Sequence, residues 1–194
     1  MNRREALKNV AILLGTTISA STTTILFESF TLPENEKNAV AFTDDQKKIL
    51  TEMAEIIMPT TKSSPGAKAA GVGKFIPMMV NDCYPAKQQQ RFAKGLSEFE
   101  ERAQTEFGKN FLALNNTERT KMLIDLRLGA IAQKESKDAA TADISYFFTI
   151  TRDLTLLGYF ASEIGCTQAR AYLPIPGRYD GNVPLKPGQK SWAT

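Results

Sequence analysis

The sequence contains no histidine, and this absence excludes several kinds of active site. Only two of its 194 residues are cysteine and one is tryptophan. Without histidine there is no Ser-His-Asp or Cys-His catalysis, no imidazole metal ligand and no His-ligated haem. Two cysteines cannot complete a Cys-only zinc site or an ordinary iron–sulfur cluster, because these need about four thiolates. Catalysis by this chain would have to rely on other groups, chiefly carboxylates.

Outside the N-terminal region, the sequence has almost no excess of either positive or negative charge. The net charge is +3, but the first 20 residues hold three of the 24 basic residues and one of the 21 acidic residues. The remainder therefore has 21 basic and 20 acidic residues, well interspersed. A nearly neutral body offers no electrostatic footprint for nucleic acid, so we predict no nucleic-acid partner. The composition, 42% hydrophobic and 23% charged, is that of a globular protein.

Nucleotide-binding fingerprints are absent as well. No G-x-G-x-x-G occurs, which excludes the common dinucleotide motif. Residues 66–74 have the first spacing of a P-loop, but Val72 stands where lysine is required and no strand precedes the glycines. We interpret this segment as a Gly-rich turn that enters a helix, and we predict no cofactor on this chain.

Carboxylates are present, but their pattern does not predict an acid–base site. Catalytic carboxylates must be partly buried near each other so that their pKa values separate. The candidates here are interleaved with Lys or Arg on faces that we expect to be solvated, and we predict no catalytic and no metal-ligating residue. The candidates are Asp44, Asp45, Glu98, Glu100, Glu101, Asp143 and Asp153.

The N-terminus has the architecture of an export signal. A short basic region is followed by an uncharged stretch over residues 9–27, diluted by serine and threonine. The basic region resembles the twin-arginine motif, which predicts a periplasmic protein exported in the folded state. Two alternatives are an amphipathic helix with a chance arginine pair and an uncleaved anchor over residues 10–27. The predicted signal residues are Arg3, Arg4, Leu7 and Lys8.

The body predicts an all-α fold, a small irregular bundle of about five helices. Thr43 with Gln46 and Asn115 with Glu118 have the spacing of helix-capping boxes, and Gly108 is a C-terminal stop. No convincing alternating strand pattern occurs. The expected helices cover residues 43–58, 72–82, 85–107, 115–132 and 139–157, with a charged loop at 133–138. The last helix is expected to be central and rich in aromatics, and a continuation past Gly158 to Gly165 is an alternative. Ile131 and Leu157 are expected on the apolar faces of the last two helices. The expected domains are a signal at 1–27, a linker at 28–42, a helical domain at 43–165 and a C-terminal arm at 166–194.

The C-terminal arm combines prolines with tyrosine and tryptophan residues. Four of the nine prolines lie after residue 173, which favours an extended backbone. The arm is too apolar for a plain linker, so it must lie either on its own helices or on another protein. For Trp192 we favour a partner, because free termini fray unless they are tied down. The predicted partner-binding residues are Tyr159, Tyr172, Pro174, Pro176, Tyr179 and Trp192.

The two cysteines allow three interpretations. In an oxidising compartment Cys83 and Cys166 could pair with each other, or one could bridge to a partner subunit. They could also be buried free thiols that pack as small hydrophobic residues. We favour a disulfide, and the sequence does not choose between intramolecular and intermolecular pairing.

Several short pieces, in order along the body, resemble the gluconate 2-dehydrogenase subunit 3 family. Each piece is weak alone, and their order and spacing together make the resemblance specific. They are Phe42-Thr43, Ile56-Ile57-Met58-Pro59, Pro65-Gly66-Ala67, Gly71-Val72, Phe75-Ile76, Gly95-Leu96, Phe107-Gly108, Phe111 to Leu114, Phe147-Phe148, Leu154 to Phe160, Tyr172, Pro174 to Gly177 and Tyr179-Asp180-Gly181.

This resemblance implies a non-catalytic accessory subunit. In such complexes a large subunit holds FAD and oxidises a sugar or polyol, a multihaem cytochrome c subunit usually accepts the electrons, and the complex is membrane-associated. The small subunit carries the signal for the twin-arginine translocase and escorts and stabilises the folded large subunit. Two competing hypotheses are a stand-alone periplasmic enzyme that uses carboxylates and a membrane-tethered scaffold or binding module.

Overall fold

The computed structural model describes residue 5 and residues 40–135, 142–175, 177 and 181–193. The chain divides into the units Met1–Asn38 and Ala39–Thr194. Arg3, Arg4, Leu7, Lys8 and the possible anchor over residues 10–27 lie outside the described residues, so their roles remain predictions.

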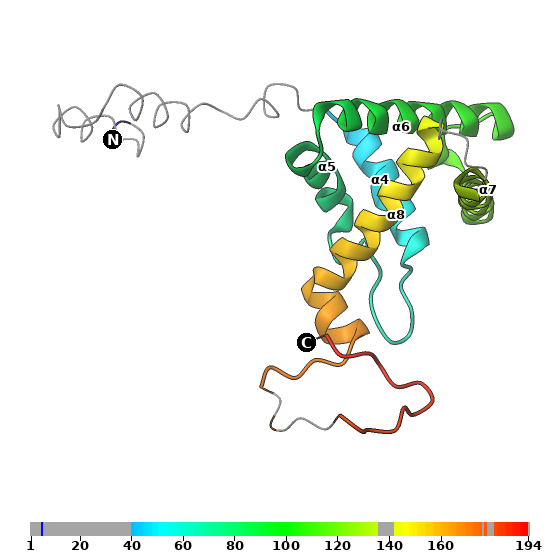
Figure 1. The fold of residues 1–194 in the computed structure, drawn as a ribbon. Coiled ribbons are helices and arrows are strands. Elements are labelled where there is room, and N and C mark those ends of the chain that lie inside the picture. Colours follow the sequence, from blue (N-terminus) through cyan, green and yellow to red (C-terminus); the bar gives the residue numbers. More distant parts are fainter. Residues whose placement is uncertain (1–4, 6–39, 136–141, 176, 178–180, 194) are drawn as a thin grey trace, which may run out of the picture. The chain divides into compact units, whose positions relative to one another are not determined.

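The second unit is built from helices, which confirms the predicted all-α class (Figure 1). No strand occurs in the described residues, which hold one isolated bridge. No helix among them is both long enough and apolar enough to span a bilayer. The elements are α4 (Asp44–Ile57), α5 (Val72–Cys83), α6 (Ala86–Phe107), η1 (Phe111–Ala113), α7 (Asn116–Glu135), α8 (Asp143–Ala161) and η2 (Gly165–Ala169).

Local capping fixes the boundaries that the sequence predicted. At the start of α4, the Gln46 amide donates to Thr43 Oγ1 (3.2 Å) and the Thr43 amide donates to Gln46 Oε1 (3.0 Å). Asn115 and Glu118 make the same reciprocal pair before α7, with both distances 2.9 Å. Gly108 ends α6 in the left-handed region, at φ 66°. These bonds satisfy amides and carbonyls that helix ends leave without partners.

Two predicted boundaries were wrong. Helix α7 continues through Glu135, so residues 133–135 are helical rather than part of a charged loop. Gln, Lys and Glu are good helix formers, and their charge alone does not indicate a loop. Helix α8 begins at Asp143, later than predicted, and continues past Gly158 to Ala161, as the longer alternative allowed. An acidic residue in the first turn suits the positive end of the helix dipole there.

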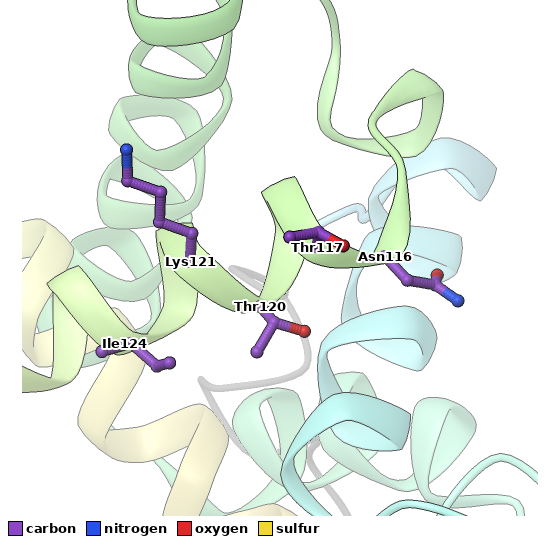
Figure 2. A pocket seen from close by; sticks show the side chains of 5 residues that line it. All are labelled: Asn116, Thr117, Thr120, Lys121 and Ile124. Atoms are coloured by element: carbon purple, nitrogen blue, oxygen red, sulfur yellow. The ribbon is translucent and has the colours of Figure 1, made fainter.

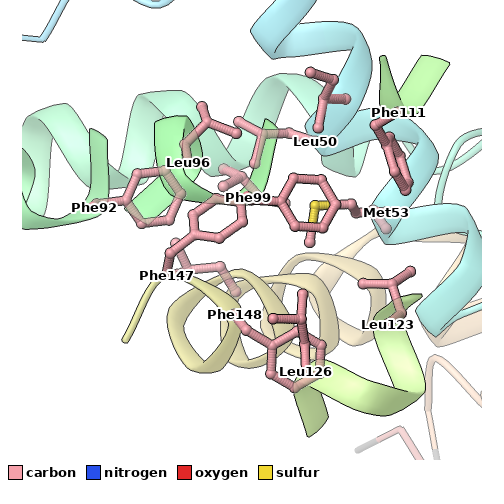
Figure 3. Packing of buried hydrophobic residues seen from close by; sticks show 14 of the residues in the cluster. Leu50, Met53, Phe92, Leu96, Phe99, Phe111, Leu123, Leu126, Phe147 and Phe148 are labelled. Carbon is pink, nitrogen blue, oxygen red and sulfur yellow. The ribbon is translucent and has the colours of Figure 1, made fainter. Parts of the chain in front are cut away.

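Helix α8 is central, as predicted, and packs against α4, α5, α6 and α7 (Figure 1). An aromatic cluster fills the space between α6 and α8 (Figure 3). The Phe147 ring centroid lies 5.0 Å from that of Phe92 and 5.7 Å from that of Phe99. The two helices approach closely at Gly95, where a Cβ atom would overlap the Asp143 carbonyl oxygen and lie 2.6 Å from Phe147 Cβ.

Two residues expected inside the bundle lie at its surface. Leu157 of α8 is 52% exposed and Ile131 of α7 is 43% exposed. On α8 the buried face passes through Thr155 and Tyr159 instead. Thr155 tolerates burial because its hydroxyl donates to the Thr151 carbonyl at 2.7 Å. The predicted helical spacing was correct, but α7 and α8 have more apolar side chains around their circumference than the neighbouring helices cover.

Candidate functional site: two exposed apolar surfaces

Tyr159 holds the loop between α4 and α5 in place and does not face a partner. Its side chain is 1% exposed, and its hydroxyl donates to the Pro65 carbonyl at 2.8 Å. The same oxygen lies 3.0 Å from Ser64 Oγ. The predicted partner-binding role of Tyr159 is therefore wrong, because a buried side chain offers no surface. Its polar tip and large apolar body suit a core position that borders a loop.

The same loop is tied to α4 by Glu55. The Glu55 carboxylate accepts bonds from the amides of Thr60 (2.9 Å) and Lys68 (2.8 Å). It lies so close to Gly66 that any side chain there would overlap it. The Gly-rich turn that the sequence indicated is thus a structural element that leads into α5. The phosphate-binding interpretation stays disfavoured, because the Glu55 carboxylate already accepts the Lys68 amide of this turn and lies beside Gly66.

The C-terminal segment forms a closed loop rather than an open arm (Figure 1). The Ala171 amide donates to the Ser191 carbonyl at 2.8 Å, and the Ala193 amide donates to the Ala171 carbonyl at 2.9 Å. The Lys190 ammonium also donates to the Gln168 carbonyl of η2. We call the described residues between Ala171 and Ala193 the C-terminal loop. The described residues after η2 contain no helix, as predicted, but the two ends of the segment are joined to each other.

The C-terminal loop carries large apolar side chains on its outside. Ile175 is 83% exposed and Leu185 is 85% exposed. Pro174 is exposed as well, whereas Pro176 and Tyr179 lie outside the described residues. Large exposed apolar side chains gathered on one segment are typical of a binding surface. The other exposed apolar residues of the loop are Tyr172, Leu173, Val183 and Trp192.

A second exposed apolar surface lies on α7. Ile124, Leu128 and Ile131 follow each other at spacings of four and three residues, so they form one stripe, which we call the α7 outer stripe. Figure 2 shows its N-terminal part, where Thr120 and Lys121 lie beside Ile124 along a shallow pocket. A groove of about 410 Å³ between α4, α7 and α8 adjoins the stripe. The residues that line this groove are Ile56, Ile57, Thr120, Leu123, Ile124, Arg127, Phe148, Arg152 and Leu156.

The two cysteines are free thiols in the structure. Cys83, exposed at the end of α5, has its sulfur 3.9 Å from Met79 Sδ, and Cys166 Sγ donates to the Phe160 carbonyl at 3.2 Å. The structure therefore contains no disulfide between them. A bridge from one of them to a partner subunit remains a prediction.

The carboxylates that the sequence singled out are mostly ion-paired. Asp143 contacts Lys94 at 2.6 Å and Arg91 at 2.9 Å, and these hydrogen bonds, first that of Lys94, lower the pKa of its carboxyl group. Burial, and then the charge of Asp45, raise the pKa of Glu100. In the described part of the chain, no three acidic or cysteine side chains come together in a way that could hold a metal ion.

Further pairs have a clear structural role. Glu98 accepts the Ile144 amide at 3.0 Å, so together with Asp143 it joins α6 to the first turn of α8. Arg119 donates to Glu52 (3.1 Å) and to the Phe111 and Leu112 carbonyls (3.2 and 2.6 Å), which joins α7 to α4 and η1. Such bridges between elements hold the helices in position.

Sequence reasoning missed the α7 outer stripe. The expected apolar face of this helix consists of Met122, Leu123, Leu126 and Ile131. It leaves out Ile124 and Leu128, which do not fit the spacing of Met122 and Leu126. An ordinary surface helix has one apolar face, so a helix with two indicates a second binding surface. That signal was present in the sequence.

A helical body with two exposed apolar surfaces has the features of a subunit of a larger assembly. The family model for gluconate 2-dehydrogenase subunit 3 matches residues 44–177. The chain therefore belongs to the gluconate 2-dehydrogenase subunit 3 family, whose members are subunits of a dehydrogenase complex. No curated protein and no solved structure matches the chain significantly.

Proposed function

We propose that this protein is a non-catalytic accessory subunit that escorts and stabilises an exported FAD-dependent dehydrogenase of the gluconate, sugar or polyol type. The observation that carries the proposal is the C-terminal loop on a member of a dehydrogenase-subunit family: side chains as apolar as Ile175 and Leu185 are exposed there. Burial of such side chains at an obligate interface stabilises both partners. FAD and the redox chemistry belong to the large subunit in this proposal.

The export role rests on the sequence of the N-terminus. Arg3, Arg4, Leu7 and Lys8 match the twin-arginine motif, whose translocase carries folded proteins. One signal can then carry a small subunit together with a flavoprotein that has already bound its cofactor. The assembled complex is expected in the periplasm, associated with the membrane, with a cytochrome c subunit as its usual electron acceptor.

Binding is tested by co-producing the tagged full chain with a large FAD-binding dehydrogenase subunit from the same organism. We expect a stoichiometric, yellow complex, and we expect Ile175→Asp with Leu185→Asp to lower the yield of this complex. Met78→Asp is the matched control, since Met78 is a 50% exposed apolar residue on α5. A yellow, active dehydrogenase made of this chain alone would contradict the proposal, and so would the complete absence of a complex.

Export is tested with Arg3→Lys plus Arg4→Lys. Both subunits should then remain in the cytoplasm, while a protein with a general secretory signal is exported normally in the same cells. Normal export of the large subunit would show that this chain is not its escort. Fractionation that leaves the chain in the membrane without any partner would favour the tethered scaffold instead.

A further inference from the structure

Helix α7 is apolar on two opposite sides, and only one of them is used inside the bundle. Met122 and Leu126 are buried in the core, at 0% and 2% exposure. On the other side, Ile124 is 50% exposed and Leu128 is 59% exposed. The outer side of a surface helix is ordinarily polar, because apolar surface in water costs free energy. Nothing among the described residues covers the α7 outer stripe.

The groove beside the stripe is apolar at its base and open to solvent along α7. Phe148 of α8 and Leu123 of α7 are buried beneath it, and Ile56 and Leu156 form its sides. A trough between helices with apolar side chains from three of them suits an amphipathic helix, which places residues i, i+3, i+4 and i+7 into such a groove.

The charges around the groove indicate the chemistry of its occupant. Arg127 lines the groove and Lys121 stands at the opposite edge of the stripe, and neither has a hydrogen-bond or ion-pair partner among the described residues. Arg152, by contrast, is paired with Asp153 at 2.7 Å. Asp125 is the one acidic residue on this middle part of α7, which leaves an excess of positive charge. A complementary ligand therefore carries acidic groups beside its apolar stripe.

We infer that this groove and the α7 outer stripe bind an amphipathic helix of the large dehydrogenase subunit, with an acidic side chain placed beside Arg127. The inference rests on the proposed function, and it assigns the contact to a surface separate from the C-terminal loop. Membership of a dehydrogenase-subunit family indicates a protein partner, and the shape of the groove suits a helix. Lys121 and Arg127, which have no partner among the described residues, favour acidic groups on that helix.

Two other occupants fit less well. A second copy of the chain packed stripe to stripe would bring Lys121 and Arg127 of both copies into one interface, where like charges repel. Binding to an anionic membrane typically uses clusters of about four to eight basic residues, whereas this face offers two unpaired cations and contains Asp125. Both are kept as outcomes of the test.

The test places a photo-crosslinking amino acid, p-benzoylphenylalanine, at position 128 of the full chain in the co-produced complex. The comparison positions are 78, an apolar site on α5 that is 50% exposed against 59% for Leu128, and 175, in the C-terminal loop. We expect position 128 to crosslink to a helical, acid-containing segment of the large subunit, identified by mass spectrometry. Position 78 should give no such product.

The outcomes separate this inference from the proposed function. A crosslink from position 175 but not from position 128 would leave the accessory role intact and overturn the helix site. A crosslink from position 128 to a second copy of this chain, to its own residues 6–39, or to lipid would overturn it too. Failure of the complex to form would remove both claims.

The charge requirement has its own measurement. Arg127→Glu should weaken binding of the large subunit by about tenfold or more. The affinity of this variant should also depend less on salt concentration than that of the unchanged chain. Lys109→Glu is the matched control, because Lys109 is exposed in the turn after α6, and it should change binding less than about twofold. Equal affinities for the two variants would contradict the inference that an acidic side chain of the large subunit lies beside Arg127. Circular dichroism checks that both variants remain folded.

Discussion

Large apolar side chains are buried at the α6–α8 contact and exposed on the outer side of α7. Between α6 and α8, Phe92 and Phe147 are almost completely buried. On α7, Leu128 is 59% exposed. The first set stabilises this chain by itself, whereas the second can stabilise only an assembly. Substitutions should therefore separate residues that govern folding from residues that govern association.

The largest effect on folding is expected from Phe147→Ala. Phe147 is 0% exposed and its ring packs on those of Phe92 and Phe99, so the change leaves a cavity at the centre of the bundle. We expect a loss of about 3–5 kcal/mol in the free energy of unfolding, measured by urea denaturation. Leu128→Ala serves as the control and should cost less than about 1 kcal/mol. Equal losses would contradict the comparison.

The second prediction uses two glycines as a matched pair. Gly95→Ala should destabilise the fold by about 1–3 kcal/mol, because its Cβ atom would meet the Asp143 carbonyl and force α6 and α8 apart. Gly129 on the exposed side of α7 has nothing near its Cβ position. Gly129→Ala should therefore stabilise the chain by about 0.5–1 kcal/mol through helix propensity. Thermal unfolding of the two variants would reveal whether their signs are opposite.

A smaller loss is expected from Tyr159→Phe. The change removes the hydrogen bond to the Pro65 carbonyl and keeps the buried ring, which should cost about 1 kcal/mol. Tyr172→Phe, on the exposed C-terminal loop, is the control and should have no measurable effect on stability. Hydrogen exchange should show faster opening of residues 60–68 in Tyr159→Phe alone. Unchanged exchange there would mean that Tyr159 does not hold this loop.

The smallest effect is a dependence of stability on pH. The pKa of Asp143 is lowered in the folded chain, so its ion pairs with Lys94 and Arg91 stabilise the fold above the ordinary aspartate pKa of about 4. This contribution is lost as the pH falls through the lowered pKa. Asp143→Asn should therefore be less stable than the unchanged chain at pH 6, and the difference should shrink below pH 4. A difference that is constant from pH 6 to pH 3 would contradict this role.

Features fixed by local chemistry could be predicted from the sequence. The capping pairs at Thr43 and Asn115, the stop at Gly108 and the period of the buried residues in α4 and α6 all depend on neighbours within about one helical turn. The all-α class with a central α8 was also predicted correctly, because long apolar stripes at helical spacing need other helices to cover them.

Features that depend on distant parts of the chain could not be predicted. Tyr159 is buried because residues 64 and 65 of another loop reach its hydroxyl, across a separation of more than 90 positions. Leu157 and Ile131 are exposed although they follow the helical spacing, because their burial depends on which distant elements pack against α8 and α7. Closure of the C-terminal loop depends on the pairing of Ala171 with Trp192, which proline spacing does not encode.

That pairing at the base of the C-terminal loop has a consequence for affinity. An open tail would lose conformational entropy when a partner immobilises it, at about 1–2 kcal/mol for each backbone residue that becomes fixed. In this protein, part of that entropy is already lost when the chain folds, because Ala171 forms hydrogen bonds with Ser191 and Ala193 without a partner. Side chains such as Ile175 and Leu185 are then offered on a preorganised ring, and more of their burial energy remains available for binding.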